Sequence, residues 1–331
     1  MLTRIKTKEC FKNCTLAAGF FKLVRLALLA VFVSLPLLSC SAAGIESGEP
    51  SLGTDNPGEF RDNTPVVQQV EQPGILVAQS SSAVIDYSNY RNGYICAKTM
   101  VEGRFKVLVD APDGAVYQFT IDQPGQYITI GLSRGNGHYI AAFWQNTTDN
   151  LYASMFVVQL DVEIENQMLP FLYPNQYVFF TPDDRAVRLS QEVTEGATSE
   201  IEAIEAIYLW CVMNLSYDYN KARTVQPGYL PDNNDTLDTL NGICFDYAVL
   251  CTSMMRAQRM PTRIEIGYIG DVYHAWLSIY TSEHGMIRKV IVFDPDTWVL
   301  LDPTMDSSSK TPLGLGPLFI KPEDYQPMFY Y

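Results

Sequence analysis

A turn that opens an apolar helix constrains this chain more than any other part of its 331 residues. Gly242 lies just before Cys244, and apolar side chains then recur at helical spacing as far as Ala257. The sulfur of Cys244 is therefore expected near a helix N-terminus, where free backbone N–H groups and the helix dipole favour an anion. A thiol in such a place is often populated as the thiolate, which is its nucleophilic form.

Two side chains further along the chain supply the other groups that an activated thiol needs. His274 lies in an alternating, strand-like run over 272–280, and Asp302 follows the apolar run that ends at Leu301. A nucleophile requires a base and a group that orients the base, and a fold can bring them together at any distance in sequence. The order Cys244, His274, Asp302 therefore predicts nucleophile, base and orienting carboxylate.

Four short pieces around these residues resemble, in the same order, the core of the bacterial transglutaminase-like superfamily. They are Gly242–Ala248, Arg259–Arg263 with Gly267-Tyr268, His274-Ala275-Trp276 and Leu301-Asp302-Pro303-Thr304. The resemblance covers the last third of the chain and implies a papain-like cysteine domain, which we assign to residues 168–331. It also implies a Cys-His-Asp triad made by Cys244, His274 and Asp302.

The resemblance further points to a group upstream of the nucleophile. In the family, an aromatic or amide side chain in that region helps to stabilise the oxyanion of the reaction. Tyr217 and Tyr219 are the candidates here, although a packed tyrosine is the commoner reason for an aromatic residue at such a position.

Each residue of the expected triad has a competitor of its own type. Cys251 lies deeper in the same apolar run and is typical of a buried core cysteine. His284 stands in a hairpin-turn composition and is expected in solvent. Asp294 precedes a turn, whereas Asp302 ends a strand, so Asp302 is the preferred orienting acid.

The first 39 residues resemble a bacterial lipoprotein signal. A basic segment precedes the uncharged apolar run 26–38, which is shorter than the about 20 residues of a membrane-spanning helix. The run ends in Leu37-Leu38-Ser39-Cys40, and the resemblance implies cleavage before Cys40 and acylation of its thiol. An ordinary secretory signal and an uncleaved anchor remain alternatives. All three interpretations export residues 41–331.

The chain that remains after residue 39 is strongly acidic. Residues 1–39 hold six of the 23 Lys and Arg residues and one of the 37 acids, which leaves 17 basic against 36 acidic residues. A nucleic-acid partner is not expected, because phosphate contacts need Lys and Arg. Anionic lipid would repel such a surface, so attachment to a membrane must come from the acyl group on Cys40.

Two segments separate this anchor from the predicted cysteine domain. Residues 40–90 are rich in Gly, Pro, Ser and Asn and predict a flexible linker, with an extension of the next domain as the alternative. Residues 91–167 contain short alternating runs separated by turn residues at 112–114, 123–125 and 134–137. This pattern predicts an antiparallel β-sandwich, so the expected fold class of the whole chain is α+β.

The predicted function is an extracytoplasmic thiol acyltransferase or hydrolase. It would act through a thioester on amide bonds of proteins or peptides, cell-wall peptides included, and the sequence leaves open whether water or an amine is the acceptor. The alternative is a catalytically inert surface lipoprotein that binds a protein or cell-wall ligand. No cofactor is expected, and no metal, because the cysteines and histidines lack zinc spacing and the acidic loop at 232–235 lacks the EF-hand glycine.

Overall fold

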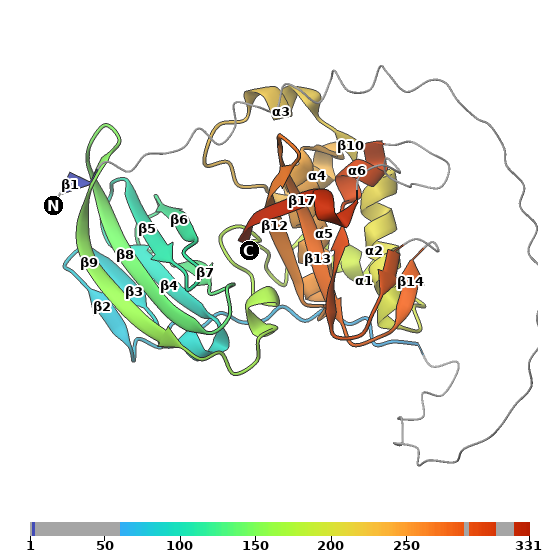
Figure 1. Ribbon diagram of the computed structural model, residues 1–331, viewed down its shortest axis with the longest axis horizontal. Helices are drawn as coiled ribbons and strands as arrows, with labels where there is room; N and C mark the ends of the chain where they lie inside the picture. Colours follow the sequence, from blue (N-terminus) through green and yellow to red (C-terminus); the bar gives the residue numbers. More distant parts are fainter. Residues whose placement is uncertain (1, 4–59, 288–290, 309–320) are drawn as a thin grey trace, which may run out of the picture.

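A computed structural model describes residues 2–3, 60–287, 291–308 and 321–331 of the chain. They form an all-β domain and a mixed domain that lie side by side (Figure 1). Cys40 and almost all of the expected signal segment lie outside the described residues. None of the helices within the described ranges is long and apolar enough to cross a membrane.

The N-terminal domain consists of two antiparallel sheets that enclose a common core, as predicted. Their strand orders are β1-β9-β8-β5-β6 and β2-β3-β4-β7. Along β6 the side chains of Tyr117, Phe119 and Ile121 are buried and alternate with more exposed ones, as expected for a strand with one face inward. The strands are β1 (Leu2–Thr3), β2 (Val77–Gln79), β3 (Ala83–Asp86), β4 (Tyr94–Thr99), β5 (Phe105–Asp110), β6 (Val116–Ile121), β7 (Ile128–Gly131), β8 (Gly137–Thr148) and β9 (Leu151–Val162), with a short 3-10 helix η2 (Tyr90–Asn92).

Two strands of the sandwich lie inside the segment 40–90 that the sequence assigns to a linker. β2 pairs with β3, and β3 pairs in turn with β4, so the folded domain begins before the expected boundary at residue 91. These strands have only three and four residues, which is too short for an alternating pattern to stand out in a Ser- and Pro-rich segment. Residues 40–59 lie outside the described part of the chain.

The segment just before these strands runs over the C-terminal domain. The Val66 N–H donates to the oxygen of Ala257 at 2.8 Å, and the Gln258 side chain donates to the oxygen of Asn63 at 2.8 Å. The Arg61 guanidinium contacts the Gln258 side chain at 3.0 Å. These contacts attach residues 61–66 to the end of the helix that carries Cys244.

The C-terminal domain is built around one central helix, α5, and a four-stranded antiparallel sheet of order β16-β13-β12-β17. Thirteen of the 14 residues of α5 are buried, because β12 and β13 cover one side of it and α1 and α2 pack on it too. Its elements are η3 (Leu169–Phe171), α1 (Arg185–Val193), α2 (Glu200–Asn214), β10 (Ser216–Tyr217), α3 (Tyr219–Thr224), α4 (Asn233–Thr239), β11 (Asn241–Gly242), α5 (Cys244–Ala257), β12 (Thr262–Ile269), β13 (Val272–Thr281), β14 (Gly285–Ile287), β15 (Ile291–Phe293), β16 (Thr297–Leu301), α6 (Pro303–Ser308), η4 (Pro322–Asp324) and β17 (Tyr325–Tyr330).

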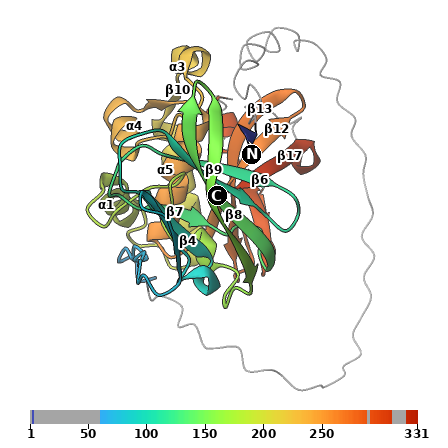
Figure 2. The ribbon, with the colours of Figure 1, turned by 90° about the vertical axis from the view of Figure 1, so that its left-hand side faces the viewer.

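One hydrophobic core continues from the sandwich into the C-terminal domain. It includes Phe119 of β6, Val249 of α5 and Tyr331, whose ring stacks on Tyr177 at 3.8 Å between centroids. Tyr331 follows β17, and the C-terminus lies between the two domains in Figure 1 and behind the strands of the sandwich in Figure 2. The mixed architecture agrees with the predicted α+β class.

Candidate active site

The sulfur-bearing residue Cys244 is the first residue of α5, as the sequence predicts. β10 and β11 pair in parallel and place Tyr217 opposite Gly242, immediately before the helix. Gly242 is required by close packing, because a Cβ atom there would lie 2.6 Å from the Cβ of Asp246. Cys244 itself is half-buried, so its thiol lies at the surface of the core.

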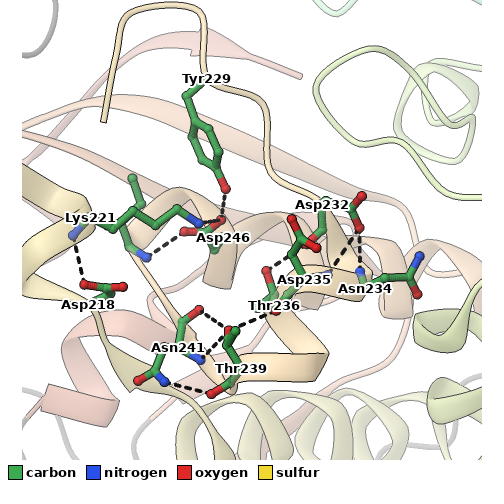
Figure 3. Close-up of polar contacts among 11 residues, drawn as sticks. Asp218, Lys221, Tyr229, Asp232, Asn234, Asp235, Thr236, Thr239, Asn241 and Asp246 are labelled. Atoms are coloured by element: carbon green, nitrogen blue, oxygen red, sulfur yellow. Dashed lines mark hydrogen bonds and ion pairs between the residues drawn. The ribbon is translucent and has the colours of Figure 1, made fainter. Parts of the chain in front are cut away.

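A fully buried carboxylate holds this helix start in place (Figure 3). Asp246 accepts hydrogen bonds from the Ile243 N–H at 2.7 Å, from the Lys221 ammonium at 2.8 Å and from the Tyr229 hydroxyl. Its position in the first turn of α5 satisfies an N–H group that the helix leaves free, and its negative charge suits the helix dipole. Asp246 therefore connects the turn before Cys244 to α3 and to the loop that follows it.

The imidazole of His274 lies between Cys244 and Asp302. His274 is on β13 and is 6% exposed, and its Nε2 lies 2.8 Å from Oδ2 of Asp302. The Cys244 thiol is its other neighbour, close enough to raise the pKa of the imidazole. Because Nε2 faces the carboxylate, Nδ1 is the nitrogen left for the sulfur.

The surroundings of His274 favour its charged form. Burial alone lowers the pKa of the imidazole, but the charges of Asp302 and Cys244 and the hydrogen bonds to both raise that pKa well above its usual value. His274 can therefore hold a proton opposite the Cys244 sulfur. An imidazolium beside a thiolate at a helix N-terminus is the arrangement that activates a cysteine.

The carboxylate of Asp302 is fixed by four donors. Its Oδ1 accepts the backbone N–H groups of Thr304 and Met305 at 3.1 and 3.0 Å, as an N-cap does at the start of a helix, here α6. Its Oδ2 faces His274 and accepts the Tyr325 hydroxyl at 3.0 Å. Pro303 takes the first position of α6, where a missing N–H costs nothing.

The competitors that the sequence offers lie in other surroundings. Cys251 is fully buried, and its hydrogen bond with Cys211 together with burial raises the pKa of its thiol. His284 and Asp294 are both largely exposed and lie 3.7 Å from each other rather than at α5. The structure thus brings together Cys244, His274 and Asp302, and none of the three competitors joins them.

The two oxyanion candidates are placed differently. Tyr217 is half-buried beside Gly242 and packs on the core, whereas Tyr219 is 58% exposed at the start of α3. Their rings contact each other edge-on at 5.0 Å between centroids. Of the two, Tyr217 has the position fixed by strand pairing next to the nucleophile turn.

Sequence reasoning missed two groups that shape the site. Asp246 could have been found, because an acid three residues after a helix start is a capping signal. Tyr325 gives no local signal: it reaches Asp302 only because β17 returns to the sheet beside β12. Within residues 60–287, 291–308 and 321–331, no group of three His, Cys, Asp or Glu side chains is arranged to hold a metal.

Comparisons with known proteins give one family match and three solved structures of low similarity. Three solved structures resemble the chain at low identity. A candidate cysteine protease of Cytophaga hutchinsonii is 15% identical, with 69% of this chain and 79% of that chain covered and a TM-score of 0.33. The periplasmic domain of TgpA from Pseudomonas aeruginosa is 16% identical (72% of this chain and 98% of that chain covered, TM-score 0.32), and a candidate protease of Parabacteroides distasonis is 9% identical (60% of this chain and 61% of that chain covered, TM-score 0.25). No curated protein matches the chain. Residues 187–303 match the model of the transglutaminase-like superfamily. Residues 187–303 therefore form a transglutaminase-like domain.

Proposed function

We propose that this protein is an exported cysteine-dependent enzyme that cleaves or transfers amide bonds of proteins or peptides. The observation that carries the proposal is the position of His274, which is buried between the Cys244 thiol and the Asp302 carboxylate. A buried imidazolium costs free energy unless an opposite charge compensates it. Buried titratable groups with such partners cluster at functional sites. The family match over residues 187–303 supports the same conclusion.

In the first half of the reaction, the Cys244 thiolate attacks the carbonyl carbon of a peptide bond or of a glutamine side chain. The carbonyl electrons move to its oxygen, and His274 gives its Nδ1 proton to the leaving nitrogen. The C–N bond then breaks, the amine departs and a thioester remains on Cys244. Asp302 stabilises the imidazolium throughout and fixes the orientation of the ring.

In the second half, an acceptor attacks the thioester carbonyl. Neutral His274 removes the proton of the acceptor, the C–S bond breaks, and Cys244 leaves as the thiolate beside a regenerated imidazolium. Water as acceptor gives a peptidase, amidase or deamidase, and a lysine or other amine gives a crosslinked product. Whether water or an amine reacts depends on how water and the second substrate reach the thioester.

The oxyanion formed in each half needs preorganised donors. The backbone N–H of Cys244 is one candidate, because it lies at the helix start and faces the same end as the sulfur. Tyr217 is our choice for the side-chain donor, since its strand pairs beside Gly242. Tyr219 is the second choice because it is more exposed.

The proposed location is the outer face of a bacterial membrane, with Cys40 as the acylated anchor. The strongly acidic composition after residue 39 supports attachment through a lipid rather than through anionic head groups. In that place the substrate would be a surface protein or a cell-wall peptide. Replacement of Cys40 by serine should release the protein from the membrane fraction, and the mass of the mature N-terminal peptide should include the acyl groups.

The central test is a search for the acyl-enzyme. Wild type and Cys244→Ala are incubated with glutamine-containing peptides, with and without an added primary amine, and intact mass is recorded after rapid acid quench. The proposal expects an acyl adduct on the wild type that maps to Cys244 and is absent from the variant. Turnover that persists in Cys244→Ala excludes the mechanism.

A second measurement separates an enzyme from an inert binding protein. Iodoacetamide at neutral pH should label Cys244 far faster than Cys96 or Cys251, because burial raises the pKa of Cys96 to about 12 and that of Cys251 is raised as well. Equal and slow labelling of all three thiols is the result expected of a catalytically inert lipoprotein.

A further inference from the structure

The strand β17 contacts the proposed triad at one end and the N-terminal sandwich at the other. Its first residue, Tyr325, donates its hydroxyl to Oδ2 of Asp302 at 3.0 Å. Its last residue, Tyr330, accepts a hydrogen bond from the Ser133 hydroxyl at 2.6 Å and donates its N–H to the Tyr117 hydroxyl at 3.2 Å. Ser133 and Tyr117 both belong to the sandwich.

The two ends of β17 are more buried than its middle. Residues 326–328 are exposed, whereas Tyr325 and Tyr330 are half-buried. The Tyr325 ring packs against the fully buried Trp276 at 5.0 Å between centroids. β17 pairs with β12 on one side, and its two end tyrosines add side-chain contacts beyond that pairing.

The far end is held mainly by Arg134 of the sandwich. Its guanidinium lies 4.0 Å from the Tyr330 ring, donates to the oxygen of Met328 and bonds to the Tyr117 hydroxyl at 2.7 Å. Asp113 lies 3.1 Å from the same guanidinium and balances its charge. Cation–π contact and charge-assisted hydrogen bonds together make this a firm attachment.

The strand also packs closely on β12, the neighbour of the strand that carries His274. Gly267 of β12 pairs with His274 on one side and with Pro327 of β17 on the other. A Cβ atom at Gly267 would lie 2.0 Å from the oxygen of Gln326, so only glycine lets β17 approach here. Movement of β17 would therefore be felt at both His274 and Asp302.

We propose that Tyr325 is a positioning residue of the proposed triad and that the sandwich, by holding the far end of β17, keeps this tyrosine on Asp302. The inference rests on the proposed function of Cys244, His274 and Asp302. It also gives the sandwich a role in the same reaction. The Tyr325 hydroxyl acts through Asp302: it shares Oδ2 with His274 and keeps the carboxylate turned toward the imidazole.

The hydroxyl is suited to this role over the whole working pH range. Burial and the negative charge of Asp302 raise the pKa of Tyr325, so its hydroxyl stays protonated and goes on donating. Tyr325→Phe removes that donor and keeps the ring on Trp276. Tyr280→Phe is the matched control, because Tyr280 lies on β13 and donates at 2.9 Å to Asp296, which is not part of the site.

The test follows the alkylation rate of Cys244 by iodoacetamide as a function of pH, read by mass spectrometry. This rate reports the thiolate without any knowledge of the substrate. In Tyr325→Phe, we expect a fall of about tenfold near neutral pH, the loss expected from one hydrogen bond to a charged group. Above the ordinary thiol pKa of about 8.5, where the thiolate forms unaided, the rate should equal that of wild type. Tyr280→Phe should follow the wild-type curve.

The part played by the sandwich is tested with Arg134→Ala and, more gently, Ser133→Ala, compared at equal folded fraction by circular dichroism. Both should shift the curve in the same direction as Tyr325→Phe, and by less. A Tyr325→Phe curve that overlays wild type overturns the inference while a reactive Cys244 still supports the proposed function. If the pH curve of Cys244 alkylation shifts in Tyr325→Phe but not in the Arg134 and Ser133 variants, the proposed role of the sandwich in positioning Tyr325 is wrong. A wild-type Cys244 no more reactive than Cys96 overturns the proposed function, and the inference falls with it.

Discussion

Two histidine–aspartate pairs in this protein have the same separation and opposite surroundings. In the sandwich, His138 Nδ1 lies 2.8 Å from Asp161 Oδ1 across the β8–β9 pairing, with side chains that are 50% and 95% exposed. In the transglutaminase-like domain, His274 Nε2 lies 2.8 Å from Asp302 Oδ2, with side chains that are 7% and 5% exposed. Distance alone therefore does not distinguish a site from a surface contact.

Burial and further partners make the difference between the two pairs. Water screens the sandwich pair, and exposed ion pairs contribute only about 0–1 kcal/mol. Asp302 instead accepts two backbone N–H groups and the Tyr325 hydroxyl, so its charge is compensated in the core and its direction is fixed. A charge held in this way can stabilise an imidazolium beside a thiol, which a mobile surface carboxylate does not do.

The largest expected effect is on the histidines themselves. His274→Ala removes the proposed acid and base, and we expect kcat/KM for peptide or glutamine donors to fall by at least about 10⁴-fold. His138→Ala removes an imidazole with the same carboxylate distance and should leave kcat/KM unchanged. Steady-state assays measure kcat/KM of both variants. A comparable fall of kcat/KM in the two would mean that burial does not distinguish the functional pair from the surface pair.

The next effect separates the two carboxylates. Asp302→Asn keeps the shape of the side chain and removes its charge, so His274 loses the group that stabilises its imidazolium. We expect kcat/KM to fall by about 10³-fold, with little change in KM. Asp161→Asn is the matched change in the sandwich and should have no effect on either constant. An Asp302→Asn enzyme with wild-type turnover would remove the carboxylate from the mechanism.

The same contrast should appear in stability between two other ion pairs of the C-terminal domain. Asp246 is fully buried and pairs with Lys221, whereas Asp238 pairs with Arg185 at the surface. Asp246→Ala leaves the Lys221 ammonium and the Ile243 N–H without their partner, so we expect the free energy of unfolding to fall by about 3 kcal/mol. Asp238→Ala should cost about 0–1 kcal/mol.

Urea unfolding of both aspartate variants gives the comparison directly. The midpoint should shift strongly for Asp246→Ala alone, with the slope of the transition unchanged. Equal shifts would show that the Asp246 contacts drawn in Figure 3 contribute no more than a surface pair does.

The features that the sequence predicts well are those with local causes. The start of α5 at Cys244 follows from a turn and a helical apolar pattern, and strands β5 to β9 of the sandwich follow from alternation between turn residues. The order of three chemically suitable residues was also enough to select the side chains that the structure brings together. The first two signals come from a few neighbouring residues, whereas the third comes from the order of Cys244, His274 and Asp302 along the chain.

The features that the sequence does not predict depend on tertiary contacts. Nothing near Tyr325 indicates that its hydroxyl meets Asp302, because that contact exists only through the pairing of β17 with β12. The segment 61–66 has linker composition, yet its backbone groups bind the end of α5. The sequence does not distinguish Tyr217 from Tyr219, and only the β10–β11 pairing places Tyr217 beside Gly242 while Tyr219 is largely exposed.

The smallest expected effect is a pH dependence of stability that belongs to the buried histidine. Its pKa is raised in the folded protein by Asp302 and Cys244, which outweigh burial, so the imidazolium binds its proton more tightly in the folded chain than in the unfolded one. The stability that this provides is complete below the unfolded pKa of about 6.5 and is lost as the pH rises through the folded-state pKa. The excess stability of wild type over His274→Gln, from urea unfolding between about pH 5.5 and 9, should therefore be greatest at the acidic end and shrink toward the alkaline end. His138→Gln controls for removal of an exposed imidazole. An excess that grows with pH would mean that burial dominates and that His274 is held neutral, in which case the thiol opposite it would have no cation to support its charge.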